Sequence, residues 1–371
     1  MRILLLTTHL NLGGIAVYVS SLAKGLVRKG HRVIVVSSGG DLVSTLAAGG
    51  VTHITVDLQT KSELHPKLLA AFVQLGAIIR QNKIEVLHAH TRVTQVLAQV
   101  LSRKLTVAYV ATCHGFFKPR LWRKLWPCWG ERSIAISQAV EEHLINDFRI
   151  PKDRVVIVHN GVEIEKFSAQ RYNRQQKDTS KSELGLRPDA PVIGSIGRLS
   201  SVKGQRYLLL ALPRILAEFP RAQLLLVGDG PERKPLQELV KELGIGQNVI
   251  FSPATPDTSK ALACIDVFVL PSLMEGLGLA IIEAQAMGLA VVASKVGGIG
   301  SLIKDGENGL LVKPRDPLAL AQAILRLLHD NALAATLGRA AAQQAREKFT
   351  LAQMVDGIER VYQEIGKGPQ C

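Results

Sequence analysis

Residues 191–204 read PVIGSIGRLSSVKG, and this stretch decides the expected fold. Its first six residues are a short, mostly apolar run, and Gly197 and Gly204 bracket the turn that follows. A buried strand that runs through a glycine-rich turn into a helix is typical of a strand–helix–strand unit with a parallel sheet. The turn also carries Arg198 and Lys203, five residues apart, which could oppose one diphosphate. Two solvated loop charges are the alternative interpretation.

The same alternation of short apolar runs and longer amphipathic stretches extends through the chain. Strands are predicted at residues 3–7, 32–37, 53–56, 85–88, 107–112, 133–136, 155–158, 191–196, 224–227, 249–252, 267–270 and 290–293. Helix-like segments in the first half cover 15–29, 66–81 and 91–103, and the tail from about 316 to 365 favours consecutive helices. The pattern predicts two doubly wound α/β units facing each other across a cleft, with ligands beyond the carboxyl ends of the strands.

The length of 371 residues suits two domains. Residues 169–181 are polar and nearly free of core-forming side chains, so we expect the boundary there. The expected division is a first domain over 1–168, a linker over 169–190 and a second domain over 191–350.

Composition and charge exclude several classes of protein. With 47% hydrophobic and 20% charged residues, the chain is not disordered, and its longest apolar runs are too short for a transmembrane helix. Its start is too short for a signal peptide, and its four cysteines lack metal-ligand spacing, which favours the cytoplasm. Residues 1–170 carry 21 basic and 11 acidic side chains, so the first half should face an anionic partner.

Two further glycine-containing segments carry candidate binding residues. Gly13 and Gly14 follow the first strand and open a helix, where backbone N–H groups can approach an anion; a plain structural turn is the alternative. Residues 271–284 read PSLMEGLGLAIIEA and hold Glu275 in a loop and Glu283 among apolar helix neighbours. A carboxylate at the latter position needs good hydrogen bonds, which a ribose diol would supply. In the turn 228–231, Asp229 could serve merely as a helix cap.

Further motifs follow one another along almost the whole chain: LAKGLVRKGHRV (22–33), HAH (88–90), HG (114–115), NGVEIEKF (160–167), GRLSSVKG (197–204), the E-x7-E of Glu275 and Glu283, and DGENGLL (305–311). With these motifs in this order, the chain resembles the retaining glycosyltransferases of the GT-B fold, family 4 (the group 1 transferases). The resemblance runs almost end to end.

The resemblance implies a GT-B architecture of two facing Rossmann-like domains with a cleft between them, the first binding the acceptor and the second the nucleotide sugar. It also implies that the last helix, about 351–366, packs back on the first domain; an apolar stripe from Leu351 to Ile365 fits this. The implied reaction is transfer of a hexose-type sugar to a glycan or lipid-linked acceptor, in bacterial surface polysaccharide or lipopolysaccharide synthesis.

By the same resemblance, Glu275 and His114 are the catalytic candidates, and Arg198 and Lys203 neutralise the leaving diphosphate. Glu283 holds the ribose, and Gly14 adds an N–H from the first domain. The loop after Glu275 orients the sugar and the phosphate through the backbone N–H groups of Gly276, Leu277, Gly278 and Leu279.

The donor should be a nucleotide-diphosphate sugar, with UDP favoured and GDP possible. The family's G-G-x-P-E is replaced here by GGIGS (297–301), and the segment usually near the nucleobase reads SPATP (252–256), so both departures bear on the donor's identity. No D-x-D motif is present, and residues 305–307 come nearest but fit a turn, so we expect neither a metal nor another cofactor.

A tryptophan-rich basic segment over 116–129 predicts contact with an anionic membrane or with the acceptor. A helical wheel places apolar side chains, Trp122 and Trp126 among them, on one side and Arg and Lys on the other. The candidate contact residues are Lys118, Arg120, Trp122, Arg123, Lys124 and Trp126. The expected location is the inner face of the cytoplasmic membrane; packing of the tryptophans inside the domain is the alternative.

Two other functions remain open at this point. A sugar-nucleotide epimerase or a phosphorylase uses the same architecture, although the intact E-x7-E argues against both. The net charge of +14 could instead indicate a nucleic-acid-binding protein, but no ribonucleoprotein or helix-turn-helix motif supports this, and we expect no nucleic-acid partner.

Overall fold

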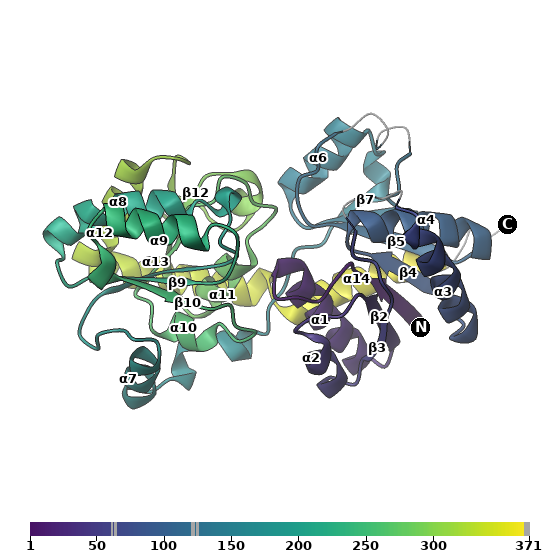
Figure 1. Cartoon of the computed structure of the whole chain (residues 1–371), viewed down its shortest axis with the longest axis horizontal. Helices are drawn as coiled ribbons and strands as arrows, with labels where there is room; N and C mark the ends of the chain where they lie inside the picture. The colour runs from purple at the N-terminus through teal and green to yellow at the C-terminus, as the bar shows by residue number, and fades with distance from the viewer. Residues whose placement is uncertain (61, 63–64, 120–122, 124–125, 367–371) are drawn as a thin grey trace. The chain divides into compact units, whose positions relative to one another are not determined.

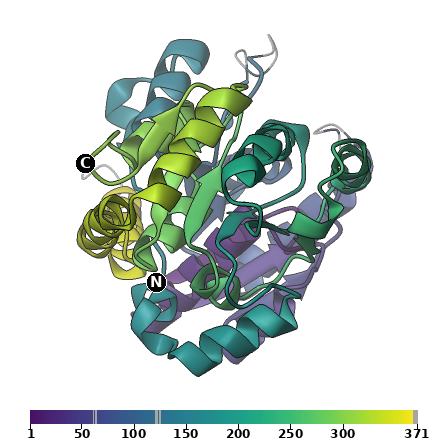
Figure 2. The same cartoon turned by 90° about the vertical axis from the view of Figure 1, so that its left-hand side faces the viewer.

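The computed structural model describes residues 1–60, 62, 65–119, 123 and 126–366. The chain forms two compact units: residues 1–160 with 351–371, and residues 161–350. Each unit is a parallel sheet with helices on both faces (Figures 1 and 2). The predicted α/β fold class is confirmed.

The sheet of the first unit has the strand order β3-β2-β1-β4-β5-β6-β7, all parallel. Its inner strands are rich in aliphatic and β-branched side chains, which are buried because both faces of the sheet are covered; the two edge strands are more exposed. In chain order, the strands of this sheet are β1 (Arg2–Leu6), β2 (Arg32–Ser37), β3 (Thr52–Thr55), β4 (Val86–Ala89), β5 (Ala108–Cys113), β6 (Arg132–Ala135) and β7 (Val155–Ile157). The helices are α1 (Gly14–Arg28), α2 (Val43–Ala48), α3 (Lys67–Gln81), α4 (Arg92–Leu105), α6 (Gln138–Phe148) and α14 (Leu351–Gly366).

Helix α14 belongs to the first unit although it ends the described chain. Its apolar stripe is buried in the same core as α1 and the central strands; the stripe consists of Leu351, Met354, Val355, Ile358, Val361, Tyr362 and Ile365. Polar contacts flank this stripe: Lys29 Nζ pairs with Asp356 at 2.6 Å, and His31 Nε2 lies 2.8 Å from Glu359 Oε1. The helix therefore completes the core of the first unit.

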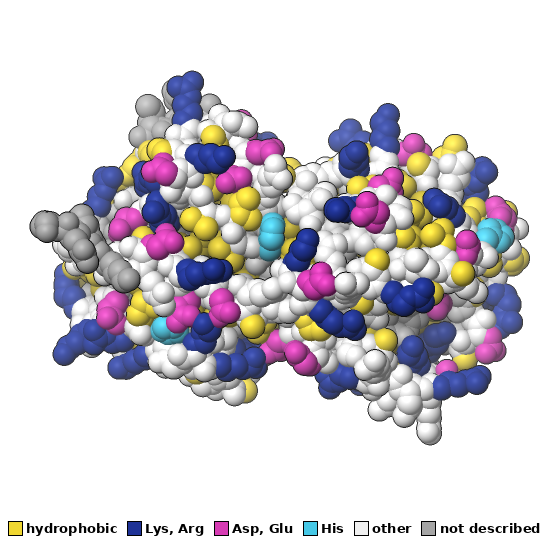
Figure 3. Space-filling view, turned by 180° about the vertical axis from the view of Figure 1, so that it is seen from behind, with side chains coloured by type: hydrophobic (Ala, Val, Ile, Leu, Met, Phe, Trp, Pro, Cys, Tyr) yellow, Lys and Arg dark blue, Asp and Glu magenta, His cyan; other side chains and the backbone are white. Residues whose placement is uncertain are grey.

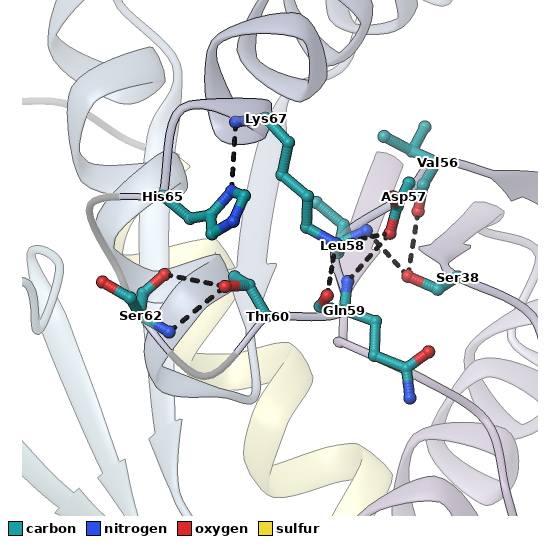
Figure 4. Close-up of polar contacts among 9 residues, drawn as sticks. All are labelled: Ser38, Val56, Asp57, Leu58, Gln59, Thr60, Ser62, His65 and Lys67. Atoms are coloured by element: carbon teal, nitrogen blue, oxygen red, sulfur yellow. Dashed lines mark hydrogen bonds and ion pairs between the residues drawn. The ribbon is translucent and has the colours of Figure 1, made fainter.

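Polar contacts lie at both ends of the connection between β3 and α3 (Figure 4). Ser38 Oγ accepts a hydrogen bond from Leu58 N (2.7 Å) and donates to Val56 O (3.2 Å). Lys67 Nζ pairs with Asp57 Oδ1 at 3.0 Å. These contacts fix the start of α3 beside the edge of the sheet.

The second sheet repeats the arrangement with the order β10-β9-β8-β11-β12-β13, again all parallel. Its strands are β8 (Val192–Ile196), β9 (Gln223–Val227), β10 (Val249–Ser252), β11 (Val267–Leu270), β12 (Ala290–Ser294) and β13 (Leu310–Val312). The helices are α7 (Arg174–Glu183), α8 (Gln205–Glu218), α9 (Arg233–Glu242), α10 (Ser259–Ala263), α11 (Leu279–Ala286), α12 (Pro317–His329) and α13 (Asn331–Lys348).

The segment expected to be a linker, 169–190, differs from that expectation. It clusters with the second unit and contains α7. A reciprocal cap begins this helix, because Asn173 Oδ1 accepts from Gln176 N and Gln176 Oε1 accepts from Asn173 N, each at 2.9 Å. Tyr172 Oη lies 2.7 Å from Ser259 Oγ, which attaches the segment to α10. The division between the units follows Asn160.

Candidate functional site

The turns that follow β8, β9 and β11 meet at the carboxyl edge of the second sheet. Strand β8 lies between the other two, so parallel pairing brings these ends together. Leu199 N donates to Asp229 O (3.0 Å), and Leu273 N donates to Val202 O (2.8 Å). Gly204 has φ +67°, and a Cβ there would lie 2.0 Å from Pro271 O, so only glycine fits this close approach.

Lys203 and Glu275 are in direct contact at this edge. Lys203 Nζ lies 2.7 Å from Glu275 Oε2, which also accepts a hydrogen bond from Ser272 Oγ at 3.1 Å. Arg198 lies exposed in the same turn as Lys203, and its guanidinium makes no hydrogen bond or ion pair with another residue that the structure describes. One cation therefore holds the loop carboxylate, while the second is available to an anion.

The loop from Gly276 to Gly278 leads into α11, which begins at Leu279. The N-terminus of a helix presents N–H groups to anions, so this turn suits a phosphate or sugar oxygen. Behind the loop, residues Gly297–Ser301 form a 3-10 helix, and Gly298 N donates to Glu275 O at 2.9 Å. The GGIGS segment (297–301), which departs from the family pattern, therefore still supports the loop that carries Glu275.

Glu283 is buried in α11 and only 8% exposed. Burial raises its pKa to about 7, opposed by a hydrogen bond from Thr258 Oγ1 (2.8 Å to Oε2) and by the charge of Lys166; the charge of Asp257 adds to the rise. A carboxyl with one donor retains capacity for further hydrogen bonds. It can therefore accept the hydroxyls of a ligand.

Asp229 does not cap α9, which corrects the interpretation of the 228–231 turn. The helix begins at Arg233, and Glu232 precedes it. Asp229 Oδ1 instead pairs with Arg233 Nη1 (2.9 Å), and its Oδ2 accepts from Ala254 N (2.8 Å). The carboxylate thus attaches the SPATP segment to the turn after β9.

Two predicted residues lie in the first unit. Gly14 is the first residue of α1, and a Cβ there would meet no atom within 4 Å, so packing does not require a glycine at this position. His114 follows β5 and is half-buried, and burial lowers its pKa to about 3. Its Nε2 lies 3.2 Å from His90 Nδ1, and its ring packs edge-on against Tyr18 at 4.7 Å between centroids.

The tryptophan-rich segment is described only in part. Lys118 is exposed, Trp126 is 41% exposed, and Arg123 Nη1 donates to Lys118 O at 3.3 Å. Trp129 is instead a core residue, packed against Phe117 and Phe148. Three of the predicted contact residues lie outside the described residues: Arg120, Trp122 and Lys124. No helix in the described part of the chain is long and apolar enough to cross a membrane.

Two further features bear on the expected absence of metal and nucleic-acid partners. Within the residues that the structure covers, no three His, Cys, Asp or Glu side chains converge in a way that could hold a metal ion. The acidic turn at 305–307 is structural, because Asp305 Oδ1 accepts from Leu311 N at 2.8 Å. On the face shown in Figure 3, basic and acidic side chains are intermingled.

Sequence reasoning missed the residues that hold the predicted ones in position. Ser272 and Thr258 each donate to a predicted carboxylate, and His90 contacts His114. Ser272 precedes Glu275 by three residues and His90 belongs to the HAH motif (88–90), so both had a local signal. Thr258 had none, because its contact depends on how α10 and α11 pack.

Comparisons with known proteins identify the family of the chain. Residues 12–166 match glycosyltransferase family 4, and residues 176–344 match glycosyl transferases group 1. An uncharacterized glycosyltransferase of Methanocaldococcus jannaschii is 30% identical, covering 94% of each chain. The D-inositol 3-phosphate glycosyltransferase of Corynebacterium diphtheriae is 29% identical over 94% of this chain and 89% of its own.

Solved structures share the fold. Anabaena HepE, crystallised with UDP-glucose, superposes with a TM-score of 0.87 at 24% identity, covering 98% of this chain and 100% of its own. One conclusion follows from the two parallel Rossmann-like sheets, the two matched family segments and the near-complete coverage by a relative. The chain belongs to the family 4 glycosyltransferases of the GT-B fold and is a transferase enzyme.

Proposed function

We propose that this enzyme transfers a hexose-type sugar, with retention of configuration, from a UDP-sugar to a hydroxyl of a glycan or lipid-linked acceptor. The observation that carries the proposal is the cation pair of the turn after β8, because Lys203 contacts Glu275 and Arg198 in the same turn is exposed. A diphosphate leaving group needs such cations, since negative charge develops on it as the glycosidic bond breaks. HepE, of the same fold, is solved with UDP-glucose, which favours UDP over GDP.

In the proposed reaction, the bond between the anomeric carbon and the diphosphate oxygen breaks, and a bond to the acceptor oxygen forms on the same face. The proton of the acceptor hydroxyl goes to the leaving phosphate, so a pair of catalytic carboxylates is not required. Glu275 accepts hydrogen bonds from the sugar, and Glu283 from the ribose. Gly14 N–H and His114 are the first unit's proposed contacts to the donor. Neither a metal nor another cofactor enters this scheme.

The test is UDP release from UDP-glucose, with GDP-mannose for comparison, by the wild type and by Arg198→Ala. We expect about a 10²–10³-fold lower rate in the variant, since removing one donor to developing negative charge costs about 2.7–4 kcal/mol. Arg206→Ala, an exposed arginine on the following helix α8, is the matched control and should retain activity. Equal rates for wild type and Arg198→Ala at saturating donor would refute the assignment. The anomeric configuration of the product, measured by NMR, tests retention.

We further propose that residues 116–129 hold the enzyme at an anionic membrane on its cytoplasmic side, where bacterial surface polysaccharide or lipopolysaccharide precursors are built. The exposed Lys118 and the 41% exposed Trp126 support this, since tryptophan beside basic residues favours the headgroup region. Co-sedimentation with anionic vesicles should fall for Trp122→Ala/Trp126→Ala. It should be unchanged for Leu318→Ala, which removes another exposed apolar side chain, on α12. Equal binding to neutral and anionic vesicles would contradict the proposal.

A further inference from the structure

The predicted catalytic His114 is one of three histidines that form a row in the first unit. His88 and His90 lie on the same face of the sheet at the end of β4, and His114 follows the neighbouring strand β5. The rings of His88 and His90 are 4.1 Å apart, and those of His90 and His114 are 5.5 Å apart. His88 and His90 are at most 1% exposed. This cluster sits where ligands bind in such sheets.

Both ring nitrogens of His88 have hydroxyl partners. Nδ1 lies 2.6 Å from Tyr362 Oη on α14, and Nε2 lies 2.6 Å from Thr112 Oγ1 on β5. Because a hydroxyl can donate or accept, His88 is satisfied in either tautomer. It anchors one end of the row and places no constraint on His114.

The contact between His90 and His114 is more restrictive. Burial lowers the pKa of His114 to about 3 and that of His90 well below its usual range, so both rings are neutral near pH 7. Their hydrogen bond, 3.2 Å from His90 Nδ1 to His114 Nε2, therefore has one N–H and one lone pair. Either His90 donates and His114 carries its proton on Nδ1, or His114 donates from Nε2 and its Nδ1 is an acceptor.

The other nitrogen of His90 separates these two arrangements. His90 Nε2 is buried and has no hydrogen-bond partner among the residues described. If His114 donated, the single proton of His90 would lie on Nε2, as a buried N–H without a protein acceptor. If His90 donates, Nε2 carries only a lone pair. Unpaired buried N–H groups are the rarer of the two in folded proteins.

We propose that His90 is a positioning residue whose Nδ1–H donates to His114 Nε2, which fixes His114 as the Nδ1–H tautomer, a hydrogen-bond donor. Tyr18 packs edge-on against both rings, with centroids 5.6 Å from His90 and 4.7 Å from His114, and so restrains their orientation. No described residue is hydrogen-bonded to His114 Nδ1. This N–H is then directed to an oxygen acceptor of the ligand; that this ligand is the donor sugar rests on the proposed function.

The tautomer can be read in the free protein, without any substrate. Two-bond ¹H–¹⁵N correlation spectra of ¹⁵N-histidine-labelled enzyme separate protonated from unprotonated ring nitrogens, and His114→Gln assigns the signal. We expect His114 to show a protonated Nδ1 and an unprotonated Nε2. A protonated Nε2 on His114 in the wild type would overturn the proposal.

Two variants of equal size test the hydrogen-bond donor of His90. His90→Leu removes this N–H group and should allow the Nε2–H tautomer of His114. We expect at least a tenfold lower kcat for UDP-glucose, equivalent to about 1.4 kcal/mol. His90→Asn keeps an amide N–H near the position of Nδ1 and should restore the Nδ1–H tautomer and most of kcat. Wild-type kcat in His90→Leu, or no recovery in His90→Asn, would refute the positioning role.

Thermal unfolding of both variants controls for folding. If His90→Leu does not fold, the wild-type spectrum and His90→Asn still decide the proposal. Failure of the wild type to turn over any sugar nucleotide would contradict the proposed function alone, because the tautomer is measured without substrate.

Discussion

Replacing Glu283 by glutamine should change how stability depends on pH. Burial raises the pKa of this carboxyl from an ordinary 4.5 to about 7, so between these values the folded protein retains a proton that the unfolded chain has released. The free energy of unfolding therefore falls as pH rises from 4.5 to 7. At 1.36 kcal/mol per pKa unit, the decrease is about 3 kcal/mol. Glutamine does not titrate and can still accept the hydrogen bond of Thr258.

The assay is thermal unfolding of wild type and Glu283→Gln from pH 4 to 9, without nucleotide. Because both proteins share every other ionisable group, including the buried histidines, the difference between their curves isolates Glu283. From pH 4.5 to 7, the free energy of unfolding of the variant should rise by about 3 kcal/mol relative to that of the wild type. This corresponds to roughly 6–12 °C in Tm for a unit of this size. Thr258→Val, which removes the hydrogen bond that lowers this pKa, should move the upper end of the window above pH 7. Curves that stay parallel from pH 4 to 9 would refute the reasoning.

Three further outcomes are expected. Gly204→Ala should destabilise the protein by at least about 2 kcal/mol in urea unfolding, because alanine at φ +67° is strained and its Cβ would meet Pro271 O; an unchanged midpoint would contradict this. Tyr362→Phe should lower the free energy of unfolding by about 1–3 kcal/mol, because the buried His88 Nδ1 loses its hydroxyl partner. A decrease below about 0.5 kcal/mol would contradict this. UDP release should persist in excess EDTA; loss of activity restored by Mg²⁺ or Mn²⁺ would overturn the proposed metal-independent reaction.

Most strands were predictable because parallel strands buried on both faces leave a strong signal, whereas the three-residue strand β13 (Leu310–Val312) was not predicted. The aliphatic run predicted at 32–37 is β2 (Arg32–Ser37), and the run at 267–270 is β11 (Val267–Leu270). The segment 169–190 was predicted as a linker because its composition is polar. It forms α7 through the reciprocal cap of Asn173 and Gln176, a local signal that outweighs composition.

The placement of the candidate residues was predictable where each lies in a turn after a predicted strand, as for Arg198, Lys203 and the loop before α11. Contacts between elements distant in the chain were not. The Lys203–Glu275 ion pair joins residues 72 apart, and the Thr258–Glu283 hydrogen bond joins residues 25 apart. Both depend on strand order and helix packing, which a local pattern does not specify.

The E-x7-E spacing places two carboxylates in opposite electrostatic environments. Glu275 precedes α11, contacts Lys203 and lies near N–H groups at the helix start, which favour negative charge. Glu283 lies one turn from the end of the same helix, buried, with a pKa of about 7.

Donor binding would therefore act differently on Glu275 and Glu283. In the proposed reaction, a diphosphate competes with Glu275 for Lys203 and leaves the carboxylate available to sugar hydroxyls. Ribose hydroxyls in turn supply Glu283 with donors that stabilise its ionised form. Nucleotide binding near pH 6.5 should accordingly release a proton, measurable by calorimetry in buffers of different ionisation enthalpy, and this release should vanish in Glu283→Gln. Equal proton release in both proteins would assign it to another group.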